Sequence, residues 1–167
     1  MDRGITLGNK QKLPFLFISI VILVLDQITK KMIVSTMWLG ESQRIIGDVV
    51  RFTYVRNPNS VFGLHFGGPV VSTALTIVAF LFVVYLFIVA KTPIFLTAIS
   101  FIMGGALGNL IDRVIYMEVV DFIEIVVGRF RWYTFNVADS FVSIGIVLVL
   151  IHWFIETRHV NSHSDSL

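Results

Sequence analysis

The sequence predicts an α-helical membrane protein in which four transmembrane helices carry a small β-sheet subdomain on the outer face. Hydrophobic residues make up 56% of the 167 positions and charged residues 14%, and the mean hydropathy is +0.84. Soluble domains contain about 25% charged residues, so a soluble fold of this length could not cover so much apolar surface. An uncharged run at 69–90 is also long enough to cross a bilayer core.

We expect a single membrane-embedded domain over residues 1–167, with spans at about 13–35, 69–90, 93–112 and 136–156. Only Lys91 and Thr92 separate the second span from the third, which predicts a tight antiparallel helical hairpin. Asp26 interrupts the first span. Basic residues precede this span, as they precede the apolar run of a signal peptide. No Ala-x-Ala-like cleavage site follows it, so we expect a retained span.

The two long segments between spans, 36–68 and 113–135, are predicted to form the outer sheet. Arg44 to Val55 is rich in β-branched and aromatic residues and predicts one or two strands. Val119 to Val127 predicts another strand, which Gly128-Arg129 turns back into 130–135. The segment 56–60 has the composition of a turn. The chain ends in a polar tail at 157–167, which we expect to be disordered from His159.

Four spans place both termini on one side, which we expect to be the cytoplasmic side. The inner segments would then hold five of the thirteen Lys and Arg residues, so a raw positive-inside count favours the opposite orientation. Charges near the first helix carry the most weight in this rule. The basic N-terminus and Lys91, between the second and third spans, both favour cytoplasmic termini.

Several kinds of chemistry lack the residues they need. The chain has no cysteine, which excludes disulfides, thiolate metal sites, a cysteine nucleophile and a lipid anchor on the chain itself. The four histidines are scattered, His65 lies alone and no HExxH motif occurs, so we expect no metal and no cofactor. The basic residues are also scattered, so no nucleic-acid partner is expected.

Charged residues inside apolar spans are retained by pairing or by function. Asp26 and Lys30 lie four residues apart, so they either form an ion pair within the helix or leave Lys30 to meet a substrate carbonyl or lipid phosphate. Gly104 and Gly108 predict a close helix-packing face. Three polar residues end this span: Asn109, Asp112 and Arg113. They either support the structure or belong to a functional site.

Two further carboxylates stand in apolar surroundings at the same membrane face. Asp121 interrupts a strand-like run and would point to the opposite face from Glu124, while Asp139 lies at the mouth of the last span and could simply cap it. Without a serine–histidine set, paired carboxylates are the chemistry that the residues favour. A small ion-coupled transporter using Asp26, Lys30 and Asp139, and a non-catalytic membrane scaffold, are the alternatives.

Five sequence blocks together resemble the bacterial lipoprotein signal peptidase (signal peptidase II) family, in the family's order. They are Asp26–Lys30 (DQITK), Asn57–Gly63 (NPNSVFG), Gly104–Arg113 (GGALGNLIDR), Val119–Phe122 (VVDF) and Phe135–Ser140 (FNVADS). The second block departs from the family's pattern at Asn59-Ser60-Val61, where Gly and Ala are usual. Asn tolerates positive φ, so we expect its turn to persist.

The resemblance implies an aspartyl endopeptidase that removes the signal peptide from diacylglyceryl-modified prolipoproteins, cutting before the lipidated cysteine. By this resemblance Asp121 and Asp139 are the catalytic residues. The polar residues that support them or contact the substrate are Asn57, Asn109, Asp112, Arg113, Asn136, Asp26 and Lys30. The expected partners are these prolipoproteins and membrane lipids. We expect a monomer in the bacterial cytoplasmic membrane, with its active site near the outer face.

Overall fold

Four long apolar helices form most of the computed structural model, which describes residues 8–58 and 68–164. They are α1 (Leu13–Thr36), α2 (Gly68–Val89), α3 (Pro93–Tyr116) and α4 (Val137–Ser164), and a short 3-10 turn, η1 (Asn9–Lys12), precedes α1. Each of the four is long and apolar enough to cross a membrane. Together with the sheet described below, they confirm the predicted fold class.

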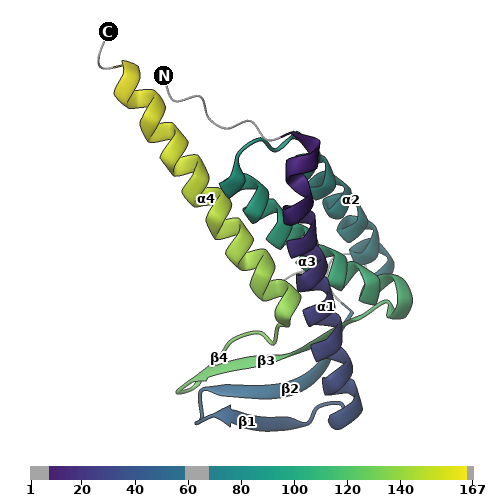
Figure 1. Cartoon of the computed structure of the whole chain (residues 1–167). Helices are drawn as coiled ribbons and strands as arrows, with labels where there is room; N and C mark the ends of the chain where they lie inside the picture. Colours follow the sequence, from purple (N-terminus) through teal and green to yellow (C-terminus); the bar gives the residue numbers. More distant parts are fainter. Residues whose placement is uncertain (1–7, 59–67, 165–167) are drawn as a thin grey trace.

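The helix α3 holds the bundle together, because α1, α2 and α4 all pack against it (Figure 1). Its glycines allow this close approach: a Cβ added to Gly104 would lie 2.7 Å from the backbone oxygen of Ser19 in α1. A Cβ on Gly105 would collide with the backbone oxygen of Ala138 in α4. The packing face predicted for Gly104 and Gly108 is therefore confirmed, since both meet α1.

A four-stranded antiparallel sheet lies at one end of the bundle, as predicted (Figure 1). Its strands follow chain order: β1 (Ser42–Ile46), β2 (Val50–Asn57), β3 (Val119–Val127) and β4 (Phe130–Arg131). Gly47 and Gly128 have positive φ, of 52° and 61°, at the two hairpin turns. The register between β2 and β3 pairs Val55 with Asp121, which brings the end of β2 beside the start of β3.

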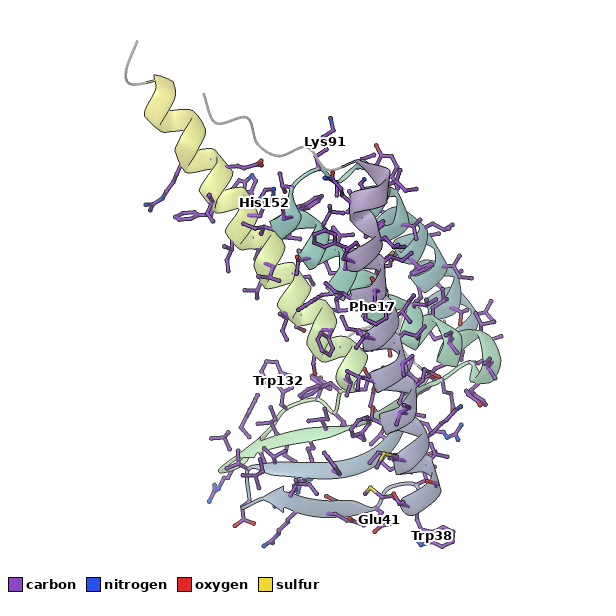
Figure 2. The ribbon with its side chains drawn as sticks, viewed as in Figure 1. Phe17, Trp38, Glu41, Lys91, Trp132 and His152 are labelled. Carbon is purple, nitrogen blue, oxygen red and sulfur yellow. The ribbon has the colours of Figure 1, made fainter. Side chains whose placement is uncertain are left out.

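A small apolar core joins the sheet to the last turn and a half of α1. Ile33 and Met37 pack there against Tyr54 of β2 and against Val120 and Phe122 of β3. At the sheet end of the molecule Trp38 and Trp132 are exposed, whereas Lys91 lies at the opposite end (Figure 2). Exposed tryptophans of this kind suit the interface between lipid and water.

The prediction of a disordered tail from His159 is wrong as far as Ser164, because α4 continues to that residue. No glycine or proline follows Gly145 within this helix, so nothing in the sequence ends it earlier. A local contact stabilises this part of the helix, with the Arg158 guanidinium 4.4 Å from the centre of the Phe154 ring. The departing loop positions Asn59-Ser60-Val61, and His65, lie outside the described residues.

The returning strand after Gly128 is shorter than predicted. β4 covers only Phe130 and Arg131, and the rest of the segment crosses back to α4 apart from one isolated bridge between Phe135 and Ile123. The third helix ends at Tyr116 rather than 112, where Met117 adopts φ 58° and its N–H bonds the carbonyl of Arg113. This left-handed residue terminates the helix and directs the chain into β3.

Gly104→Val should destabilise the protein by roughly 1–3 kcal/mol, because the added methyl groups would overlap the α1 backbone. The measurement is the thermal unfolding midpoint of detergent-purified protein. Ala79→Val is the matched control, since Ala79 lies on the exposed face of α2 and its extra methyl groups meet no protein atoms that must move. Equal midpoints for both variants would contradict close packing at Gly104.

Candidate active site

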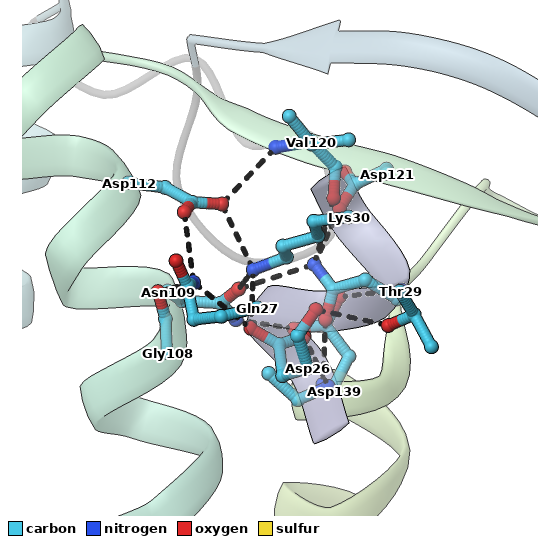
Figure 3. A network of polar contacts seen from close by, with 12 residues as sticks. Asp26, Gln27, Thr29, Lys30, Gly108, Asn109, Asp112, Val120, Asp121 and Asp139 are labelled. Atoms are coloured by element: carbon cyan, nitrogen blue, oxygen red, sulfur yellow. Dashed lines mark hydrogen bonds and ion pairs between the residues drawn. The ribbon is translucent and has the colours of Figure 1, made fainter. Parts of the chain in front are cut away.

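The ammonium group of Lys30 is the centre of a buried polar network between the helices and the sheet (Figure 3). It lies 2.8 Å from the Asp26 carboxylate, 2.9 Å from that of Asp112 and 2.9 Å from Oδ1 of Asn109. All three of its N–H donors are therefore used. The ion pair predicted within α1 is confirmed, and the buried Lys30 is not placed to meet a lipid phosphate at the surface.

The two carboxylates that hold Lys30 also bind the backbone of other elements. Asp26 accepts a hydrogen bond of 2.9 Å from the N–H of Ala138, in the first turn of α4. Asp112 accepts a longer one, of 3.4 Å, from the N–H of Val120 in β3. Because Gly108 has no side chain, the Asp26 carboxylate fits directly against α3. The network thus fixes α1, α3, α4 and β3 relative to one another.

Two asparagine side chains carry the network onward from Lys30. Asn109 Oδ1 accepts hydrogen bonds from Lys30 and, over 3.1 Å, from Nδ2 of Asn136. The Nδ2 group of Asn109 donates to the Asp139 carboxylate over 2.8 Å. Lys30 acts only as a donor, so it orients the Asn109 amide with its oxygen toward the cation and its nitrogen toward Asp139.

Asp121 and Asp139 both accept hydrogen bonds from Asn136. The Asn136 Nδ2 group donates to the Asp121 carboxylate over 2.7 Å, while its backbone N–H donates to the Asp139 carboxylate over 3.2 Å. Asn136 Oδ1 in turn accepts the Asp139 N–H, which completes a reciprocal cap at the start of α4. Asn57, at the end of β2, donates to the other Asp121 oxygen over 3.0 Å.

Burial raises the pKa of the Asp121 carboxyl from 3.8 to about 7, and the neighbouring charge of Asp139 contributes to this rise. Hydrogen bonds from Asn57 and Asn136 lower the pKa, as does the more distant positive charge of Lys30, but they do not offset burial. Near neutral pH both the protonated and the ionised form of Asp121 are therefore populated, which suits general acid–base chemistry.

Arg113 lies beside this network but is not hydrogen-bonded to it. Its Nη1 donates to the hydroxyl of Ser72 in α2 over 2.9 Å. With Lys30 it supplies two positive charges against the four carboxylates of Asp26, Asp112, Asp121 and Asp139. Among the described residues no group of three or more His or acidic side chains could hold a metal ion.

Eight of the nine residues predicted for the site share this one network, and Arg113 lies next to it. The strand prediction that separated Asp121 from Glu124 is confirmed, because Glu124 instead binds Thr53 and Arg131. The transporter alternative is not favoured, since its relay residues gather at the sheet end and the first half of α1, from Leu13 to Leu25, has no charge.

Sequence reasoning missed two residues that take part. Gln27 donates to the Asp112 carboxylate over 3.0 Å and to the carbonyl of Gly108 over 3.2 Å, so it holds α1 to α3 beside Lys30. It stands in the DQITK block, and its place next to Asp26 was the one available signal. Ser72 has no such signal, because a single serine within an apolar span usually bonds its own helix.

Comparison with known proteins identifies the family of this chain. The family described as signal peptidase (SPase) II matches residues 18–155. A lipoprotein signal peptidase of Syntrophus aciditrophicus is 34% identical over 150 residues, covering 86% of this chain and 93% of the relative. One from Listeria monocytogenes is 33% identical over 146 residues, covering 86% and 95%. One from Blochmanniella pennsylvanica is 36% identical over 153 residues, covering 87% and 92%.

Two solved structures described as bacterial membrane enzymes have the same fold. One superimposes with a TM-score of 0.81 at 33% identity and covers 92% of this chain and 93% of its own. The other has a TM-score of 0.77 at 33% identity and covers 90% and 96%. Family, relatives and structures agree over most of the sequence, and the chain therefore belongs to the signal peptidase II family of membrane aspartic proteases.

Proposed function

We propose that Asp121 and Asp139 are the catalytic pair of an endopeptidase that cleaves diacylglyceryl-modified prolipoproteins immediately before the lipidated cysteine. The family supports signal peptide removal from prolipoproteins. The observation that carries the catalytic assignment is the Asn136 bridge, which holds the two carboxylates together in a buried site. The other two carboxylates of the described network, Asp26 and Asp112, each lie within hydrogen-bonding distance of the Lys30 ammonium group. In that network Asp121 and Asp139 have no cation so close.

The proposed mechanism follows from keeping two carboxyl groups close together. They cannot both ionise cheaply, so they share one proton and titrate as a pair. The ionised member takes a proton from water, which attacks the scissile carbonyl. The protonated member donates a hydrogen bond to the carbonyl oxygen and then assists collapse of the tetrahedral intermediate.

The position of the pair suits a substrate that is partly in lipid. Asp139 lies in the first turn of α4, and Asp121 lies in β3, where it accepts a hydrogen bond from Asn136, the residue that precedes this helix. A signal helix and acyl chains could therefore stay in the bilayer while the mature protein lies in water. Asp26 and Lys30 act in this proposal as structural support, because their contacts lie within the protein.

The proposal is tested with detergent-purified protein and a diacylglyceryl-modified prolipoprotein as substrate. Mass spectrometry should find a product whose N-terminal residue is the lipidated cysteine. Substrate without the diacylglyceryl group should be cut far less. No conversion of the modified substrate, or a cut at another bond, would contradict the proposed activity.

In the same assay Asp121→Asn and Asp139→Asn should each lower turnover by at least roughly a hundredfold, because each removes one partner in proton transfer. Asp48→Asn is the control, since Asp48 is an exposed aspartate at the β1–β2 turn. Unfolding midpoints would be measured for all three variants. Turnover of either dyad variant at the wild-type rate would remove that residue from the catalytic pair.

The fall of kcat/KM at alkaline pH, the alkaline limb of the pH profile, should report the loss of the proton that Asp121 and Asp139 share. Because the pKa of Asp121 is about 7, we expect kcat/KM to fall as the pH rises through about 7. The hydrogen bond from Asn57 favours the ionised carboxylate and lowers this pKa, so Asn57→Ala should move the limb to higher pH.

Gln43→Ala is the control for the pH measurement, because the Gln43 amide bonds only the exposed Glu41 and lies away from the site. It should leave the alkaline limb where the wild-type protein has it. A limb that does not move in Asn57→Ala, or moves to lower pH, would contradict the assignment of this limb to Asp121.

We also propose that the sheet faces the outside of a bacterial cytoplasmic membrane and that the termini are cytoplasmic. The chain contains no cysteine, so single cysteines report sidedness cleanly. In intact cells a membrane-impermeant maleimide should label Ile46→Cys, on the exposed face of β1, but should label Lys91→Cys only after permeabilisation. The reverse pattern would overturn the orientation.

A further inference from the structure

Arg113 is a buried cation with very few partners. The residue is only 5% exposed, and a guanidinium group carries five N–H donors and a permanent positive charge. Across the described residues it makes one hydrogen bond, to Ser72, while its buried Nε has no partner. No carboxylate in this part of the chain lies within ion-pair distance of it.

The charges around Arg113 pull it toward the catalytic pair. The carboxylates that act on it electrostatically are Asp121, Asp139 and Asp112. Asp112 is already occupied by Lys30 and Gln27. The remaining attraction is therefore directed to Asp121 and Asp139, and burial of these groups limits its screening by water.

Ser72 offers the Arg113 guanidinium a different partner. It lies near the start of α2, is only 1% exposed, and directs its hydroxyl oxygen at Nη1 of Arg113 from a helix that carries no charge. A hydrogen bond to a charged donor is among the stronger ones in a protein. This bond joins α2 to the end of α3 that carries the site.

We propose that Ser72 is a positioning residue, whose hydroxyl holds the Arg113 guanidinium away from Asp121 and Asp139 and so leaves the pair free to share a proton. This inference rests on the proposed catalytic role of the pair. It gives α2 an indirect role in catalysis, although this helix contains no charged residue and none of the five sequence blocks.

Loss of the hydroxyl would let Arg113 move onto the pair. A direct ion pair with either carboxylate stabilises its ionised form and lowers the apparent pKa values of the pair. The other charged groups facing the pair are Lys30 and Asp26 from α1 and Asp112 from α3, and their mutual contacts do not involve Ser72. The proton needed by the scissile carbonyl would then be lost at lower pH.

The test compares Ser72→Ala with Ser72→Thr and with Ser100→Ala, in the prolipoprotein cleavage assay over a range of pH. Ser100 is an equally buried serine, on α3, whose hydroxyl donates to its own helix at Leu96, so this variant controls for loss of a buried hydroxyl. We expect Ser72→Ala to lower kcat at least tenfold, about 1.4 kcal/mol, and to move the alkaline limb to lower pH. Ser72→Thr keeps a hydroxyl and should restore both.

The outcomes distinguish a failure of the role proposed for Ser72 from a failure of the proposed peptidase activity. Wild-type protein that cleaves its substrate, together with a Ser72→Ala variant whose kcat and alkaline limb match those of Ser100→Ala, would overturn the role of Ser72 alone. A limb that moves to higher pH would also overturn it, because Arg113 would then have left the pair. If Ser72→Ala lowers only the unfolding midpoint, the residue is structural. Wild-type protein without any cleavage would overturn the proposed function first.

Discussion

The buried ammonium group of Lys30 is the interaction on which the rest of the site depends. An uncompensated charge inside a membrane bundle costs several kcal/mol, and removing one partner of a buried pair typically costs about 3–5 kcal/mol. Lys30 avoids that cost by giving all three donors to Asp26, Asp112 and Asn109. Its partners then bind backbone groups of α4 and β3, so one cation determines how four elements meet.

The proposed catalytic pair, Asp121 and Asp139, is held mainly by neutral amides rather than by cations. Asn57, Asn109 and Asn136 donate to Asp121 or Asp139 without adding positive charge. Amide donors orient a carboxylate while leaving burial free to raise its affinity for a proton, as the pKa of about 7 at Asp121 illustrates. A lysine in direct contact would orient it equally well and would keep it ionised. Lys30 therefore supports the structure of the site, while the asparagines orient the two carboxylates for the proton transfer proposed above.

Close helix packing makes room for this arrangement. Gly104 and Gly105 let α3 approach the backbones of α1 and α4, and Gly108 admits the Asp26 carboxylate between α1 and α3. In lipid, where apolar contact gives little net drive for association, such packing and the buried polar bonds supply most of the specificity. The helix α2 has fewer contacts with the site, and reaches it through the bond between Ser72 and Arg113.

By itself the sequence determined the membrane class, the four spans, the sheet on the long loops and the polar residues that share one buried network. Uncharged runs, strand-forming loops and polar residues in apolar surroundings are local properties, and the motif blocks singled out Asp121 and Asp139. Local composition did not determine where α4 ends, and it did not distinguish Asp112, which binds Lys30, from Asp139, which bonds only amides. Nor did it mark Ser72 as the partner of Arg113. Those features depend on which side chains meet across helices, and only the tertiary structure decides that, because partners far apart in sequence set the charge balance and the hydrogen bonds of each group.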